Sequence, residues 1–296
     1  FRRVLFRSKE FSMAFATFNF FSKSLMRTVP INVVIPTDKI VFPGMPVPEK
    51  KPFKTLYLLH GILGNYTDWV NGTRIQALAN DNNLCVVMPS GENKFYCDSE
   101  ISGDRYGKFI AEDLVEFTRD TLPLSRKRED TFIGGLSMGG FGSIVNGLRH
   151  PETFGCITAL SSALIKEKIL SASNEPGHDF FTRRQYETLF GVDKIEDYAG
   201  SENDYEALAD KLKNADNKPK IYMACGTEDS LFDANVAFKD KLIEDGFDVT
   251  WEKGPGVHNW VFWDAYIEKA INWLPLGETI KGVSSENVGI PTKEEK

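Results

Sequence analysis

The chain of 296 residues lacks an apolar run near the ~20 residues that a helix needs to span a bilayer. It also lacks any block of Lys and Arg residues, and its formal net charge is −7. An acidic chain without a basic patch is poorly suited to bind nucleic acid or an anionic membrane surface. We therefore expect neither to be the main partner.

Cysteine is scarce, with four residues and no C-x-x-C pair. Cys85, Cys156 and Cys225 lie in apolar runs, where a free thiol behaves as a small buried hydrophobic group. We expect a chain without disulfides, located in the cytoplasm. There is also no H-E-x-x-H motif and no cluster of His and Asp residues, so we expect no metal and no cofactor.

The two ends of the sequence differ from the middle. Residues 1–12 precede the first methionine, and we expect them to be a non-native or disordered leader. Residues 277–296 are mostly polar and aperiodic, which predicts a disordered tail. A single domain is expected over residues 13–276.

Short apolar runs alternate with segments of helical period through this domain. Such runs are typical of central strands in a parallel sheet that is covered on both faces. They occupy residues 55–60, 84–89, 131–136, 156–161 and 220–226. An antiparallel pair is predicted before them, at 14–21 and 27–36. This order predicts an α/β fold with a mostly parallel, doubly wound sheet.

Residues 164–218 interrupt the alternation, because they contain helical patterns but no convincing strand. A structureless loop of that length would be unusual, so we interpret the segment as a small inserted cap. The alternative is an ordinary crossover connection with extra helices.

One serine stands among glycines in "IGGLSMGGFG", residues 133–142. Residues 135–139 match G-x-S-x-G, a pattern that is weak alone. Here it follows a predicted strand and begins a helix whose face carries Phe141 and Ile144. Strand, tight turn and helix are the context of a nucleophile elbow, so Ser137 is the predicted nucleophile.

A serine hydroxyl needs a base to accept its proton. The four histidines are His60, His150, His178 and His258. His258 lies on a glycine-rich turn before the last helix, which fits the chain order Ser, acid, His of this type of site. We predict His258 as the base, with His60 as a structural residue and His150 as a cation at a helix end.

An acid must orient the imidazole, and the oxyanion needs donors. Asp229 follows the strand at 220–226 and is the predicted acid, with Glu228 and Asp233 as alternatives. The predicted donors are the backbone N–H groups of Met138 and of Ile62, which lies in "HGILG" after the first parallel strand.

Four motifs together resemble a known family. "LLHGILGNYTDWV", "FIGGLSMGGFGS", "CGTEDSLF" and "GVHNWVFW" are similar to the esterase family that contains S-formylglutathione hydrolase (esterase D), tributyrin esterase and the bacterial feruloyl and acetylxylan esterases. The resemblance covers residues 14–275 and implies an α/β-hydrolase fold with a triad of Ser137, Asp229 and His258. The formylglutathione branch has a Ser-Gly-Leu-Thr-Cys type segment in place of "HGILG", which favours the tributyrin and cinnamoyl esterase branch.

The expected activity is hydrolysis of short acyl or hydroxycinnamoyl esters, including acylated oligosaccharides. The alternatives are a thioesterase of the S-formylglutathione hydrolase type and a non-catalytic protein of the same fold. Trp69, Phe95, Tyr96 and Trp260 are candidates for substrate-pocket walls, and the alternative for each is a core position. The sequence does not decide between a monomer and a homodimer.

Overall fold

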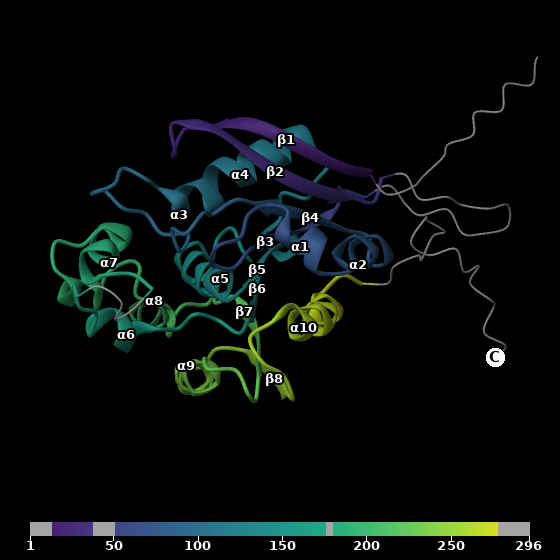
Figure 1. Cartoon of the computed structure of the whole chain (residues 1–296). Helices are drawn as coiled ribbons and strands as arrows, with labels where there is room; N and C mark the ends of the chain where they lie inside the picture. The colour runs from purple at the N-terminus through teal and green to yellow at the C-terminus, as the bar shows by residue number, and fades with distance from the viewer. Residues whose placement is uncertain (1–13, 38–50, 176–179, 278–296) are drawn as a thin grey trace, which may run out of the picture.

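The computed structural model describes residues 14–37, 51–175 and 180–277 (Figure 1). The leader predicted at 1–12 lies outside the described residues, as does the predicted tail beyond residue 277. Within the described part, eight strands form one sheet in the order β1-β2-β4-β3-β5-β6-β7-β8. The strands are β1 (Ala14–Ser22), β2 (Arg27–Ile35), β3 (Lys54–Leu59), β4 (Leu84–Pro89), β5 (Thr131–Leu136), β6 (Cys156–Leu160), β7 (Lys220–Gly226) and β8 (Val249–Gly254).

The direction of pairing confirms the predicted topology. β1 pairs with β2, and β2 with β4, in antiparallel register. All the other neighbours, from β4 through β3 to β8, are parallel. The structure is therefore an α/β-hydrolase fold built on a mostly parallel sheet, as the run of apolar segments predicts.

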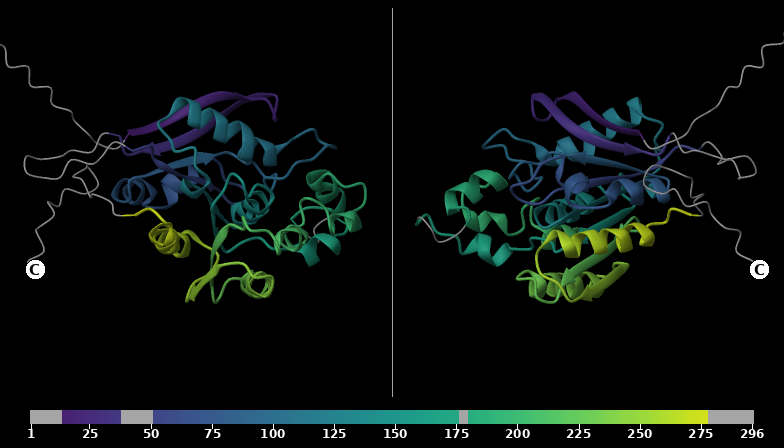
Figure 2. Two further views of the ribbon diagram at one scale, coloured as in Figure 1. Left: turned by 180° about the vertical axis from the view of Figure 1, so that it is seen from behind. Right: turned by 45° about the vertical axis from the view of Figure 1, so that its right-hand side comes forward.

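Helices cover both faces of the sheet, which explains why its central strands are apolar throughout. In β3, Tyr57 and Leu59 belong to one buried core, while Leu56 and Leu58 belong to the other. In Figures 1 and 2, α4, α5 and α9 lie on one face, and α1, α2 and α10 lie on the opposite face. The helix bounds are α1 (Asp68–Gly72), α2 (Ile75–Asp81), α3 (Tyr106–Lys108), α4 (Leu114–Thr121), α5 (Met138–Arg149), α6 (Lys166–Leu170), α7 (Arg183–Phe190), α8 (Tyr205–Leu212), α9 (Phe232–Glu244) and α10 (Trp260–Trp273).

The segment predicted as a cap contains α6, α7 and α8, which cluster at one end of the molecule in Figures 1 and 2. No strand occurs in the part of 164–218 that the structure describes. Aromatic rings join this segment to the domain. The ring centroid of Phe190 on α7 lies 5.7 Å from that of Phe95 and 6.1 Å from that of Phe141 on α5. The cap therefore packs directly on the helix that follows Ser137.

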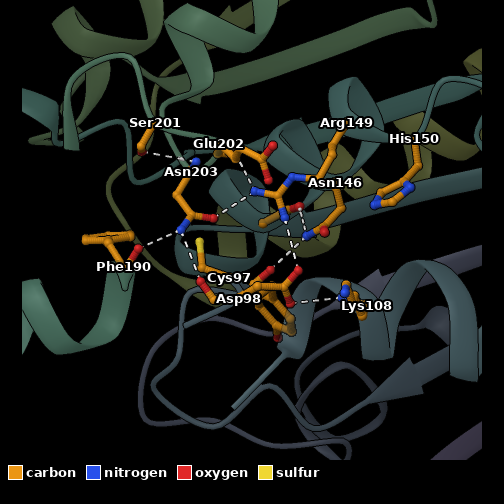
Figure 3. Close-up of polar contacts among 12 residues, drawn as sticks. Cys97, Asp98, Lys108, Asn146, Arg149, His150, Phe190, Ser201, Glu202 and Asn203 are labelled. Carbon is orange, nitrogen blue, oxygen red and sulfur yellow. Dashed lines mark hydrogen bonds and ion pairs between the residues drawn. The ribbon is translucent and has the colours of Figure 1, made fainter. Parts of the chain in front are cut away.

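Arg149, the last residue of α5, adds a polar connection between cap and domain (Figure 3). A nitrogen of its guanidinium lies 3.5 Å from a carboxylate oxygen of Asp98, and another donates to the side-chain oxygen of Asn203 over 2.7 Å. Asn203 in turn donates to the carbonyl of Phe190 over 2.9 Å. The side chain of Arg149 is 13% exposed, so one largely buried cation connects α5, the loop after β4 and the cap.

Replacing Arg149 with methionine should therefore lower the free energy of unfolding by about 2–3 kcal/mol. The substitution keeps most of the aliphatic stem but leaves Asp98 without its cation and Asn203 without a donor. Urea unfolding measures the change. Arg126→Met is the matched control, because the Arg126–Asp120 pair is more than half exposed and should contribute about 0.5 kcal/mol or less. A loss at Arg149 no larger than the loss at Arg126 would contradict the expectation.

Candidate active site

Ser137 occupies a strained backbone position between β5 and α5. Its φ is 53° and its ψ is −117°, a region that residues other than glycine seldom adopt. Neighbouring backbone fixes it from both sides. The Ser137 N–H donates to the carbonyl of Leu160 over 2.9 Å, and the Ser137 carbonyl accepts from the N–H of Ala163 over 2.9 Å. The strand, tight turn and helix predicted from the sequence are confirmed.

Two glycines beside the serine are explained by how closely the backbones approach. A Cβ atom on Gly139 would lie 2.3 Å from the carbonyl oxygen of Leu59. One on Gly135 would lie 2.5 Å from the backbone of Gly139. Because the atoms in the way are backbone atoms, any larger residue would displace α5 from the end of β3.

The structure brings His258 and Asp229 to the serine. Asp229 lies in the loop after β7, and His258 lies between β8 and α10. The Nε2 atom of His258 is 2.9 Å from Ser137 Oγ, and its Nδ1 atom is 2.8 Å from a carboxylate oxygen of Asp229. If Nδ1–H donates to the carboxylate, Nε2 is left as an acceptor for the serine proton.

Asp229 is held in its charged form. Burial acts to raise the pKa of its carboxyl group, but hydrogen bonds from His258 and from the backbone N–H of Leu231 outweigh burial and keep the pKa below its ordinary value. The two alternative acids lie elsewhere. Asp233 is exposed in the first turn of α9, and the carboxylate of Glu228 accepts from the N–H of Gly256.

The predicted oxyanion donors are backbone N–H groups in the turn after β3 and at the start of α5. The N–H of Gly64 donates to the carbonyl of Gly61 over 3.3 Å, and Leu63 in this turn has a φ of 68°. The N–H of Ile62 is not the donor of that hydrogen bond. A Cβ atom on Gly61 would lie 3.5 Å from the Cβ of Ser137, so this turn lies close to the serine. Met138 is the first residue of α5, where an N–H has no acceptor within the helix.

The other histidines have different surroundings. His60 is buried; its Nε2 accepts from the N–H of Gly91 over 2.8 Å, and its Nδ1–H donates to the carbonyl of Gly61 over 2.6 Å. Burial lowers the pKa of its imidazole, so the ring is neutral, and both ring nitrogens form hydrogen bonds to the backbone. His150 lies 3.3 Å from Glu152 after the end of α5. His178 lies outside the described residues.

Burial of the candidate pocket aromatics supports core positions for three of them. Trp69 is 1% exposed and donates its ring N–H to the carbonyl of Leu59. Tyr96 is fully buried and donates its hydroxyl to the carbonyl of His60, and Phe95 is 2% exposed. Trp260 is half-buried and borders a cavity of about 420 Å³ between α1 and α10.

The sequence reasoning missed a contact of Trp263. Its ring packs edge-on against the imidazole of His258, with centroids 4.9 Å apart. The helical pattern places Trp263 on the apolar face of the last helix. It does not show that Trp263 contacts the loop that carries His258. Asn259 fixes the start of that helix, because its side chain accepts from the N–H of Phe262.

Among the residues that the structure describes, no three His, Cys, Asp or Glu side chains are grouped so that they could hold a metal ion. Within the same residues no helix has the length and apolar character needed to cross a membrane. The four cysteines are buried free thiols.

Comparison with known proteins settles the family. Residues 22–274 match a family model described as "Putative esterase". The chain belongs to this esterase family. It is 42% identical over 263 residues to an acetyl esterase of Caldicellulosiruptor saccharolyticus, a match that covers 88% of this chain and 98% of the relative. The resemblance found in the four motifs is thus confirmed, and the protein is a carboxylic ester hydrolase.

Solved structures agree with this assignment. The fluorophosphonate-binding serine hydrolase F of Staphylococcus aureus superposes with a TM-score of 0.77 at 29% identity, covering 90% of this chain and 100% of that one. The S-formylglutathione hydrolase of the same organism gives a TM-score of 0.73 at 30% identity, covering 88% and 98%. A ferulic acid esterase at 20% identity and a TM-score of 0.69 shares the fold.

Proposed function

We propose that this esterase uses Ser137 as its nucleophile, His258 as its general base and Asp229 as the acid that orients the imidazole. The observation that carries the proposal is the continuous hydrogen-bonded chain from Ser137 Oγ through both ring nitrogens of His258 to a buried carboxylate. Those are the relative positions that a serine triad requires.

The reaction follows from that chain. Ser137 Oγ attacks the ester carbonyl carbon while its proton passes to Nε2 of His258. The carbon–oxygen bond to the alcohol then breaks, the alcohol takes that proton, and an acyl group remains on Ser137. Water attacks this acyl-enzyme with His258 again as the base, which releases the acid and restores the serine.

The negative charge that develops on the carbonyl oxygen needs fixed donors. We assign this role to the backbone N–H groups of Ile62 and Met138. Donors that already point at the developing charge need no reorganisation during the reaction, and removing one such donor costs roughly 10²–10³-fold in rate in a well-studied hydrolase.

Short acyl esters are the proposed substrates, with hydroxycinnamoyl esters as a second group. The 42% identical acetyl esterase supports the first, and the shared fold of the ferulic acid esterase is compatible with the second. The thioester alternative also keeps support, because an S-formylglutathione hydrolase is 30% identical. A parallel assay with p-nitrophenyl acetate, methyl ferulate and S-formylglutathione separates these three classes.

We propose that a cavity formed partly by the cap binds the alcohol part of the substrate. It has a volume of about 610 Å³ and lies between the loop after β4 and α7. Its wall connects to the turn that carries Ile62, because Asn93 accepts from the N–H of Leu63 over 2.8 Å. Amide, hydroxyl, cationic and aromatic groups line it, a mixture suited to an acylated oligosaccharide: Asn93, Lys94, Phe181, Thr182, Arg184, Gln185, Thr188 and Leu189.

We propose one domain over residues 13–276, with 164–218 as a cap that shapes the substrate site. A cytoplasmic location is supported by the four free thiols. A homodimer needs a direct measurement of mass in solution.

The choice of acid can be tested by substitution. Asp229→Asn should lower kcat by about 10⁴-fold, as removal of the carboxylate does in the serine-protease precedent, because the imidazole loses its orientation and charge partner. Asp233→Asn is the matched control and should leave kcat unchanged, since Asp233 is exposed on α9. Steady-state hydrolysis of p-nitrophenyl acetate measures both. The opposite ranking would move the acid to another residue.

Acyl-chain length provides a second test. Each methylene that fits an apolar site contributes about 0.8 kcal/mol, so the two extra methylenes of a butyryl ester should raise kcat/KM by up to about 15-fold over the acetyl ester. Once the site is full, a further methylene must distort packed walls at about 1–3 kcal/mol or stay in water. We expect a maximum at two to four acyl carbons and a steep fall by eight, measured with p-nitrophenyl esters. Equal rates on butyrate and palmitate esters would indicate a lipase instead.

A further inference from the structure

Glu228 precedes the proposed acid in the sequence, yet its carboxylate points to a different loop. One carboxylate oxygen accepts from the N–H of Gly256 over 2.5 Å, and the backbone N–H of Glu228 donates to the carbonyl of Gly256 over 3.1 Å. The other carboxylate oxygen accepts from the hydroxyl of Thr227 over 2.9 Å. Glu228 and Gly256 are therefore joined reciprocally, through both backbone groups of the glycine.

The loop that Glu228 holds is the one that carries His258. Gly256 lies two residues before the histidine and has a φ of 152°, which favours glycine. The backbones approach closely here, because a Cβ atom on Gly226 would lie 2.2 Å from the carbonyl oxygen of Gly256. The N–H of Thr227 also donates to the carbonyl of Gly254 over 2.9 Å. Hydrogen bonds from two consecutive residues, Thr227 and Glu228, thus join the loop after β7 to the end of β8 and the loop that follows it.

Packing holds this loop only in part, through the ring of Trp263 against His258 and that of Phe262 beside Gly256. Pro255 and Val257 are exposed, and the His258 side chain is 32% exposed. A loop with few buried contacts depends on its hydrogen bonds for a fixed conformation. A bond from a backbone N–H to a carboxylate is roughly twice as strong as one between neutral groups. The bond from Gly256 to Glu228 is of that kind, and the pKa of Glu228 is correspondingly lowered, first by this bond and then by the one from Thr227.

We propose that Glu228 is a positioning residue for the reaction: it fixes the backbone at Gly256 so that His258 reaches both Ser137 and Asp229. This rests on the proposed function, because the residue acts on the reaction only through His258. It explains why the chain carries two adjacent carboxylates, one on the imidazole and one on the loop that presents the imidazole.

The test compares Glu228→Ala and Glu228→Gln with the unmodified protein. The alanine variant removes the acceptor, and kcat should fall about 10–100-fold with KM changed less than about threefold, since a misplacement near 1 Å can cost 10²-fold. The glutamine variant keeps an acceptor oxygen and should recover kcat to within about fivefold of the unmodified protein. Glu244→Ala, an exposed residue at the end of α9, is the matched control.

A second readout separates positioning from folding. The rate at which a fluorophosphonate labels the protein should fall in parallel with kcat in Glu228→Ala, while the circular dichroism spectrum and the melting temperature stay close to those of Glu244→Ala. Unchanged kcat in Glu228→Ala would overturn the proposal. A loss in Glu228→Gln as large as in Asp229→Asn would also overturn it, because the charge itself would then act as the acid. Full activity of Ser137→Ala would instead refute the proposed function, whatever Glu228 does.

Discussion

Ser137 faces His258 from a strained backbone position with a φ of 53°, and much of the surrounding structure holds it there. A residue in such a region costs about 1–3 kcal/mol and persists only when its neighbours fix it. Here the fixing groups are the carbonyl of Leu160, the last residue of β6, and the N–H of Ala163 in the loop that follows it. The sheet therefore maintains the strain, and α5 starts in the direction that the turn sets.

The parallel sheet also explains how distant residues meet. Leu136 at the end of β5 is level with Leu160 of β6, which is level with Ala224 of β7. Gly226 of β7 is in turn level with Gly254 of β8. Loops that follow these strands emerge at one edge, so Ser137 and His258 come within 2.9 Å although 121 positions separate them. Hydrogen bonds between neighbouring loops, such as the one from Gly256 to Glu228, then fix the loop that carries the His258 side chain.

The features predictable from the sequence are those that depend on local pattern. Buried strands such as 131–136 need continuous apolar residues, and the glycines around Ser137 leave room for backbone approach, so both signals are visible along the chain. The chain order of Ser137, Asp229 and His258 follows from the fold once the elbow is found. The sequence favours Asp229 over Glu228, but the directions in which these adjacent carboxylates point are visible only in the structure.

The aromatic residues show what the sequence pattern cannot predict. In the sequence, Trp69 and Tyr96 look the same as aromatic residues that line a substrate pocket. In the structure, their polar atoms donate to the carbonyls of Leu59 and His60 inside the core. Side-chain burial depends on contacts between segments far apart in sequence, and hydrophobic pattern does not separate a core ring from a ring that lines a site. The hydrogen bonds that join the cap to α5 through Arg149 cannot be predicted from the sequence either, because they also link segments that are far apart in the chain.

The central claim is that hydrolysis passes through an acyl group on Ser137. The most direct measurement is to quench a reaction with p-nitrophenyl acetate in acid within its first turnovers and locate the acetyl group by mass spectrometry of peptides. The account predicts a single acetylated position, Ser137. An acetyl group on another residue, with Ser137 unmodified during full turnover, would contradict it.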